Sequence, residues 1–264
     1  MSLRIQNNVE AFNAHRNLSM TEGGLARSME RLSSGYRINR AADDAAGLAI
    51  SERLRGQIEG LGQAQRNGQD AISLVQTAEG SLQEVHSMLQ RVRELAVQYK
   101  NGSLSTADKT AIASEVAQLT AEIERIGTSA DFNGTKVLNA AATITFQVGA
   151  NDTDSSISVD TKNLKTLVGN LSADTSTISS IDKAIEDVSS LRGTFGAVQN
   201  RLEHTLGNLA TYQENLMASE SRIRDVDMAA EMVQFSKNQI LQQAGTSMLA
   251  QANQAPQGVL SLLR

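Results

Sequence analysis

Apolar residues recur at alternating spacings of three and four along most of this chain. The clearest run lies between Leu48 and Tyr99 and is interrupted by a glycine-rich interval. Its apolar positions are Leu54, Ile58, Leu61, Ala71, Val75, Ala78, Leu82, Val85, Leu89, Val92, Ala96 and Tyr99. This spacing is typical of the seam of a coiled coil. It predicts one helix over residues 45–100, about 80 Å long at 1.5 Å per residue.

Two further helices follow the same pattern. Asn101 and Gly102 end the first helix, and Ser105 or Thr106 can cap the next one, which is predicted over residues 105–127. Its apolar positions are Ile112, Val116, Leu119, Ile123 and Ile126. A helix over residues 177–221 is predicted from Ile181, Ile185, Val188, Leu191, Phe195, Val198, Leu202 and Leu209.

The middle of the chain changes from helical to strand-like spacing. Residues 143–148 and 156–159 alternate polar and apolar side chains, and residues 149–154 between them are rich in turn formers. This pattern predicts one β-hairpin with a longer connection, within a region of about residues 132–172.

The apolar pattern also reaches both ends of the chain. The residues concerned are Leu3, Ile5, Val9 and Phe12 at one end and Val259, Leu260, Leu262 and Leu263 at the other. Ends of ordinary domains are polar and frayed, so apolar ends need a partner surface. Aromatic residues make up only 3 % of the chain, which leaves little globular core to supply one. We expect the two ends to pair with each other and then to pack on copies of the same chain.

Residues 32–44 connect the first terminal helix to the long one. Gly35 can stop the first helix, and Asp43 or Asp44 can cap the second. The corresponding place in the C-terminal half lies near residues 221–225, where charges crowd without a clear break. The predicted fold class is mainly α: a long antiparallel helical coiled-coil bundle with one small β-hairpin region and paired N- and C-terminal helices.

The chemistry-bearing residues do not form a recognisable site. The chain has no cysteine, which excludes disulfides, thiolate nucleophiles and cysteine-ligated metals. Its three histidines, His15, His86 and His204, lack metal-ligand spacing. Asp43 and Asp44 fit a helix cap better than a catalytic pair, because no nucleophile lies near them. We therefore expect no catalytic residue, cofactor or metal, and an enzyme is the weakest interpretation.

Charge and hydropathy limit the location and the partners. The net charge of −5 argues against nucleic acid as a partner. Residues 1–8 lack the unbroken apolar stretch of a secretory signal, and no segment is long enough to span a bilayer. We expect a chain that is either cytosolic or exported by a route without such a signal.

Several long motifs resemble those of bacterial flagellins. In the N-terminal half they are residues 30–39 (ERLSSGYRIN), 43–50 (DDAAGLAI), 90–98 (QRVRELAVQ) and 131–138 (DFNGTKVL). In the C-terminal part they are residues 236–245 (SKNQILQQAG), 250–254 (AQANQ) and 260–264 (LSLLR). The motifs keep their order along the chain and cover both ends.

The resemblance implies a filament subunit of two layers. Residues 1–44 and 222–264 would form an inner terminal coiled-coil layer with a linker at about 33–44, and residues 45–221 would form the surrounding tube. The residues that the resemblance and the apolar ends assign to self-assembly are Leu3, Ile5, Val9, Phe12, Ile240, Leu241, Met248, Val259, Leu260, Leu262 and Leu263. Residues 139–180 leave room for a hairpin only, so this is a short form without outer variable domains.

The resemblance also implies partners and a location. The chain would polymerise with itself into the bacterial flagellar filament for swimming motility, after export in the unfolded state through the flagellar type III apparatus. It would assemble at the distal tip, outside the cell. An export chaperone at the C-terminal helix, the filament cap and the hook–filament junction proteins would be its other partners, with no nucleic acid and no membrane.

One segment resembles the part of flagellin that the vertebrate Toll-like receptor for flagellin recognises. The candidate contact residues are Gln90, Arg91, Leu95, Gln98 and Glu115. Arg91 and Leu95 lie four residues apart, on one helical face. We expect an apolar anchor ringed by charge-assisted hydrogen bonds.

Two other functions remain alternatives at this point. A flagellar hook–filament junction protein has helical ends of the same kind, although residues 242–247 match flagellin more closely. A soluble coiled-coil adaptor would also be rich in long helices, but its ends would be solvated.

Overall fold

A computed structural model describes residues 8–151, 155–169, 171 and 178–262, with side chains described as far as Gln254. Contacts within the chain divide it into two compact units, residues 1–56 with 216–264 and residues 57–215. This division falls within two long helices, whereas the predicted domain boundaries, 44/45 and 221/222, were placed at helix ends. Each unit is described by itself below.

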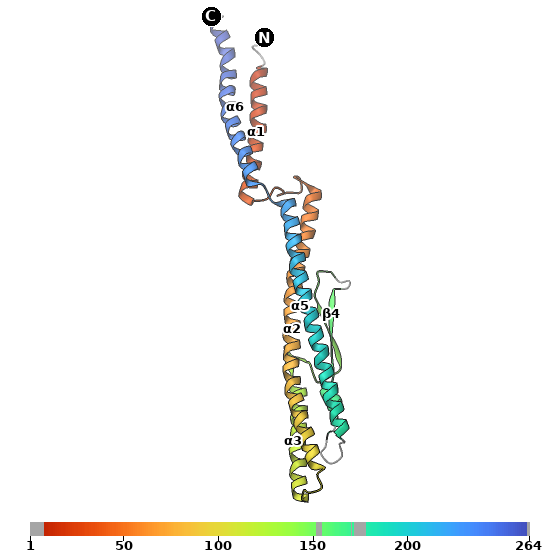
Figure 1. Cartoon of the computed structure of the whole chain (residues 1–264). Coiled ribbons are helices and arrows are strands. Elements are labelled where there is room, and N and C mark those ends of the chain that lie inside the picture. The colour runs from red at the N-terminus through yellow and green to blue at the C-terminus, as the bar shows by residue number, and fades with distance from the viewer. Residues whose placement is uncertain (1–7, 152–154, 170, 172–177, 263–264) are drawn as a thin grey trace. The chain divides into compact units, whose positions relative to one another are not determined.

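Long helices dominate both units, as the spacing predicted (Figure 1). The helices are α1 (Val9–Ser34), α2 (Ala45–Tyr99), α3 (Thr106–Ser129), α4 (Leu164–Val168), α5 (Ile178–Arg224) and α6 (Met228–Leu262). The strands are β1 (Asp131–Phe132), β2 (Thr135–Lys136), β3 (Ala142–Gln147) and β4 (Ser156–Thr161). The glycine-rich interval does not interrupt α2, which agrees with the prediction of one helix over residues 45–100.

The predicted seam of α2 lies in the core of the unit of residues 57–215. The apolar residues of this seam are fully buried between Val75 and Leu89, and they pack in one cluster with residues of α3 and α5. Ile112 and Val116 come from α3, and Phe195, which is 1 % exposed, comes from α5. Burial of one face of each long helix therefore holds this unit together.

Local sequence signals fix several helix ends. Ser105 caps α3 in a capping box, in which its hydroxyl accepts from the Asp108 N–H at 3.2 Å and the Asp108 carboxylate accepts from the Ser105 N–H at 3.1 Å. Asp44 accepts from the Gly47 N–H at 2.9 Å and so caps α2. Asp43 instead accepts from the N–H groups of Arg40 and Asn39 in the preceding turn, which lowers the pKa of its carboxyl.

The strand region holds one more pair than the sequence analysis expected. β3 and β4 form the predicted antiparallel hairpin, with Ile144 opposite Val159 and Phe146 opposite Ile157. β1 and β2 form a second pair, closed by Asn133 at φ 50° and Gly134 at φ 81°. Positive φ at both turn residues is the geometry that Asn-Gly hairpins adopt. The prediction of a single hairpin missed this pair and the short helix α4.

In the unit of residues 1–56 and 216–264, α1 and α6 lie side by side and antiparallel (Figure 1). The Asn8 side chain donates to the Ala252 carbonyl at 2.7 Å near one end, and Arg31 lies 3.5 Å from Glu231 near the other. Gly24 lets the Asn238 amide approach, because a Cβ at position 24 would lie 3.1 Å from its Nδ2 atom. Asn238 is 7 % exposed, so this side of α6 faces α1.

The two connections beside these helices pair with each other. Gly35, at φ 75°, ends α1, and Tyr36 forms an antiparallel bridge with Asp225. The Arg37 N–H donates to the Arg224 carbonyl at 2.7 Å, and the Asp227 carboxylate accepts from two N–H groups at the start of α6. The expectation that residues 221–225 have no clear break is therefore wrong, because the chain leaves the helix between Arg224 and Met228.

Candidate assembly interface

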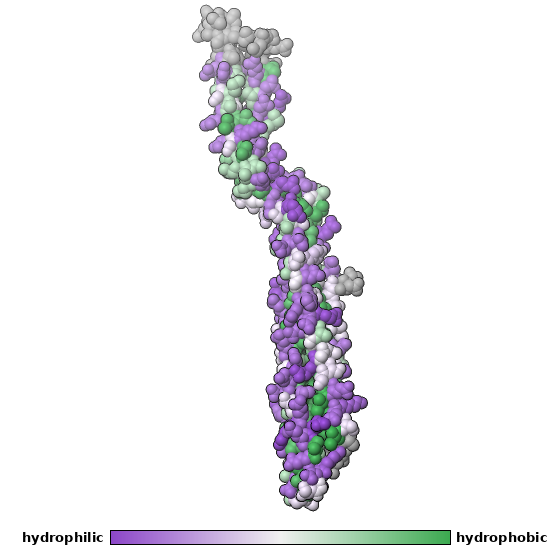
Figure 2. All heavy atoms as spheres, viewed as in Figure 1, coloured by the Kyte–Doolittle hydropathy of each residue, from purple (hydrophilic) through white to green (hydrophobic). Residues whose placement is uncertain are grey.

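Large hydrophobic side chains are exposed mainly on α1 and α6. Of the fifteen that are exposed among the described residues, ten lie on these two helices. They are Val9, Phe12, Met20, Met29, Met228, Met232, Val233, Ile240, Leu241 and Met248. Figure 2 shows hydrophobic residues on the visible surface of this helix pair. Large apolar side chains gathered on two neighbouring helices mark an interaction site more often than isolated exposed residues do.

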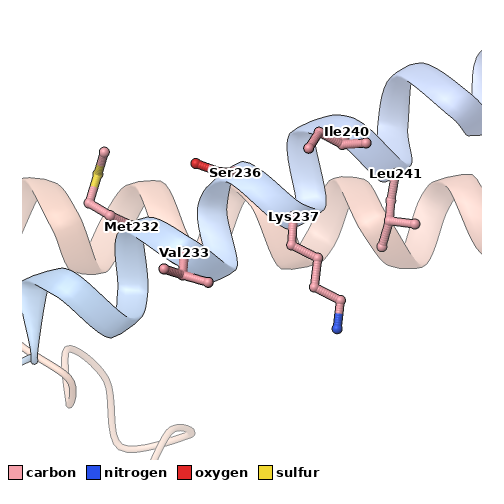
Figure 3. Close-up of a pocket in the computed structure, with 6 residues that line it drawn as sticks. All are labelled: Met232, Val233, Ser236, Lys237, Ile240 and Leu241. Atoms are coloured by element: carbon pink, nitrogen blue, oxygen red, sulfur yellow. The ribbon is translucent and has the colours of Figure 1, made fainter.

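One face of α6 carries a shallow apolar hollow that the described part of the chain leaves open. It is lined by Met232, Val233, Ser236, Lys237, Ile240 and Leu241, which are labelled in Figure 3. Their spacing, in adjacent pairs four residues apart, places all six on one helical face. Val233 is 71 % exposed and Ile240 is 66 % exposed, so this face remains largely open to solvent. We call these six residues the α6 face.

A second groove runs between α1 and α6. It mixes apolar and amide side chains, and is lined by Glu10, Asn13, Ala14, Asn17, Leu18, Thr21, Leu241, Ala244, Gly245, Met248, Gln251 and Ala252. Leu241 belongs to both hollows, so the α6 face and the groove are continuous. Together they form an open surface suited to a helical partner with a complementary face.

The predicted self-assembly residues fall into two groups. Val9, Phe12, Ile240, Leu241 and Met248 are exposed on α1 and α6. Leu3, Ile5 and Leu263 lie outside the described residues, as do the side chains of Val259, Leu260 and Leu262. The role of all these residues in assembly stays a prediction.

The sequence analysis missed Met232 and Val233 as members of the same surface. A signal was present, because Met232 and Val233 precede Ile240 and Leu241 by eight residues, close to two helical turns. Both pairs therefore share a face.

The candidate receptor contact forms a charged cluster on α2 and α3. The Arg91 guanidinium donates to the Glu115 carboxylate at 2.9 and 3.1 Å and to Glu94 at 3.2 Å. These hydrogen bonds, first to Glu115 and then to Glu94, raise the pKa of Arg91 above its usual value. Gln90 and Gln98 are exposed on the same helix.

Leu95 does not belong to this surface. It is 2 % exposed and packs in the apolar core of the unit of residues 57–215. The expectation that it forms an exposed apolar anchor beside Arg91 is therefore wrong. Arg91 and Leu95 are neighbours on the helix, but Arg91 lies on its exposed face and Leu95 lies on the face that is buried against the core.

Two other kinds of site are absent from the described residues. Among them, no group of three or more His, Cys, Asp or Glu side chains is placed to hold a metal ion. In the same part of the chain, no helix combines the length and the apolar character needed to cross a membrane.

Comparison with known proteins places the chain in a family. Residues 5–143 match the bacterial flagellin N-terminal helical region, and residues 178–263 match the bacterial flagellin C-terminal helical region. The chain is 52 % identical to a flagellin of Halalkalibacterium halodurans, over 98 % of this chain and 99 % of that one. It is 47 % identical to a flagellin of Bacillus subtilis, over 99 % of this chain and 100 % of that one.

A solved structure agrees with these relatives. The crystal structure of a Bacillus cereus flagellin is 34 % identical in sequence, with a TM-score of 0.50, over 55 % of this chain and 88 % of that one. Flagellins are structural proteins that polymerise into the flagellar filament outside the bacterial cell. The exposed apolar surface of α1 and α6, the paired helical ends and the full-length relatives agree: this chain belongs to the bacterial flagellin family and is a structural subunit of the flagellar filament.

Proposed function

We propose that the open surface of α1 and α6 is the inner self-assembly interface, which neighbouring copies of the same chain cover in the filament. The observation that carries this proposal is the α6 face, because its large apolar side chains are 47–71 % exposed in the folded chain. Leu3, Ile5, Val259, Leu260, Leu262 and Leu263 would extend the same interface toward both ends of the chain.

The energetics support a homopolymer. Burying one exposed Val, Ile or Met side chain completely stabilises a contact by about 1.5–3 kcal/mol. Association must also offset lost translational and rotational freedom, so several such side chains are needed for a stable contact. The surface supplies ten large apolar side chains on two helices, and every subunit of a polymer repeats the contact.

The same surface would need protection before assembly. An export chaperone that binds α6 would shield the α6 face from other apolar surfaces inside the cell. Export of the unfolded chain through the flagellar type III apparatus, and folding at the distal tip beneath the filament cap and beyond the junction proteins, would expose this face only where copies can cover it.

Single-cysteine labelling tests the interface, because the natural chain contains no cysteine. In the monomer, a maleimide should label the variants Ile240→Cys and Thr145→Cys at similar rates, since both positions are exposed. In seeded filaments, we expect labelling of Ile240→Cys to slow by at least about tenfold, because burial removes the thiol from solvent. Thr145→Cys, on β3, is the matched control and should remain accessible. Equal labelling of Ile240→Cys in monomer and filament would refute the interface.

A second function is favoured by the charged cluster on α2 and α3. We propose that Gln90, Arg91, Gln98 and Glu115 form a contact for the vertebrate Toll-like receptor for flagellin. Leu95 would contribute indirectly, because it packs α2 against the core beneath this contact. The Arg91–Glu115 pair is pre-arranged and exposed, so a receptor can add hydrogen bonds to it without first ordering it.

Arg91→Ala should reduce signalling by the monomer at least about tenfold in receptor reporter cells, since loss of a central Arg contact at a hot spot costs about 2 kcal/mol. Arg93→Ala is the matched control, because Arg93 is on the same helix but pairs with Asp182 of α5 at 2.6 Å. Wild-type monomer that is silent at saturating dose would contradict the proposal, as would an Arg91→Ala variant that signals like the Arg93→Ala control.

A further inference from the structure

The methionines of this chain are distributed unequally between its two units. Seven of the eight lie in the described residues, and six of these are 47–61 % exposed. All six belong to the unit of residues 1–56 and 216–264, namely Met20, Met29, Met217, Met228, Met232 and Met248. Met88 lies in the other unit, partly buried and packed against its core.

We propose that Met232 and Met248 are oxidation sites at which a peroxide switches off self-assembly of the free subunit. This inference rests on the proposed role of the α1 and α6 surface. Met232 lines the α6 face, where Figure 3 shows its thioether together with Val233, Ile240 and Leu241. Met248 lines the adjoining groove and is 60 % exposed.

The chemistry needs only a peroxide and an accessible sulfur. A lone pair of the methionine Sδ attacks one oxygen of hydrogen peroxide, the O–O bond breaks, and the second oxygen leaves as water after proton transfer. The sulfur gains one oxygen and is oxidised by two electrons, while the peroxide is reduced by two electrons. Because the chain has no cysteine, no thiol competes for the oxidant.

Oxidation changes the kind of surface that a neighbouring copy meets. Methionine is a flexible, apolar side chain that adapts to irregular contacts, whereas its sulfoxide is polar and chiral. A sulfoxide oxygen buried against apolar residues loses its hydrogen bonds to water. Ser236 and Lys237 are donors on the α6 face, and Asn13, Asn17 and Gln251 are donors in the groove around Met248. The loss at each sulfur therefore comes from the apolar side chains that a neighbouring copy brings against it.

Assembly itself should protect these sulfurs. In a filament that covers the α6 face and the groove, peroxide reaches Met232 and Met248 more slowly than in the monomer. Oxidation would thus act on subunits before they are incorporated and would leave finished filaments intact. Met88 should react slowly in both states, because it packs against the core.

The test treats purified monomer and seeded filament with hydrogen peroxide, maps sulfoxides by peptide mass spectrometry, and then measures seeded polymerisation of the monomer. We expect Met232 and Met248 to oxidise at least about tenfold faster in the monomer, and the oxidised monomer to polymerise at least about tenfold more slowly. Treatment with methionine sulfoxide reductases should restore polymerisation, since these enzymes reverse the modification.

Variants assign the effect to the two sulfurs. The double variant M232L/M248L carries no sulfur at either position, so its polymerisation rate after peroxide should equal its own untreated rate, whatever that rate is relative to the wild type. Met88→Leu is the matched control and should stay peroxide-sensitive. Normal polymerisation of monomer carrying both sulfoxides would overturn the proposal, and so would a double variant as sensitive as the wild type. Failure of the assembly proposal can be told apart from failure of the oxidation proposal. It would appear without peroxide, as equal labelling of Ile240→Cys in monomer and filament.

Discussion

Replacing Ile240 with glutamate abolishes polymerisation at concentrations where the wild-type chain forms filaments, and leaves the monomer folded. Ile240 is 66 % exposed, so the substitution removes little packing from the folded chain. In a filament that covers the α6 face, the glutamate would be buried without a partner, at a cost of about 3 kcal/mol or more. Because every subunit repeats the contact, this penalty raises the critical concentration roughly 100-fold.

Gln239→Glu is the matched control for this prediction. It adds the same charge one residue away, at an exposed position that does not line the α6 face. Sedimentation of seeded samples over a concentration series gives the critical concentration of each variant, and circular dichroism confirms the helix content of the monomers. If Ile240→Glu assembled at the wild-type critical concentration, the α6 face would not be an assembly surface.

Replacing Phe195 with alanine destabilises the monomer by about 3–5 kcal/mol, the usual cost of truncating a buried phenylalanine. Phe195 is 1 % exposed and lies in the apolar core of the unit of residues 57–215. A loss of this size lowers the midpoint of thermal unfolding by roughly 6–20 °C in a unit of this length. Circular dichroism at 222 nm measures it, since the unit is mainly helical.

Phe12→Ala provides the same chemical change with the opposite expected outcome. Phe12 is 73 % exposed on α1, so its truncation should change the stability of the monomer by no more than about 0.5 kcal/mol. It should nevertheless slow seeded polymerisation, because Phe12 belongs to the proposed assembly surface. A Phe195→Ala variant that melted with the wild type would show that the core described here does not limit stability.

The long helices and most of their ends could be predicted from sequence because their causes are local. The three-four spacing of α2 fixes which residues share a face, and this face is indeed the buried one between Val75 and Leu89. Ser105 and Asp108 form their capping box within a single turn. Signals of this kind act over a few residues and need no information about distant parts of the chain.

Two features were not predicted from the sequence, because the residues that cause them lie far apart in the chain. The break between Arg224 and Met228 is stabilised by the bridge between Tyr36 and Asp225 and by the hydrogen bond from Arg37 to Arg224. The charged residues at 221–225 do not indicate that Tyr36 and Arg37 pair with this segment. Leu95 was misplaced for the same reason, since packing against the core of the folded unit decides where the buried face of α2 ends.

The sequence by itself determined that α1 and α6 carry apolar residues that need cover, because periodicity specifies which side chains share a face of a helix. The order and length of the motifs, not the periodicity, indicated the flagellin family. Only the tertiary structure decided which face of α6 is covered by α1 and which stays exposed. Gly24 admits Asn238 on one side and Leu18 lies against Gly245, so α1 covers that side and the α6 face stays open. That choice depends on the fit between side chains more than 200 positions apart, which no local pattern encodes.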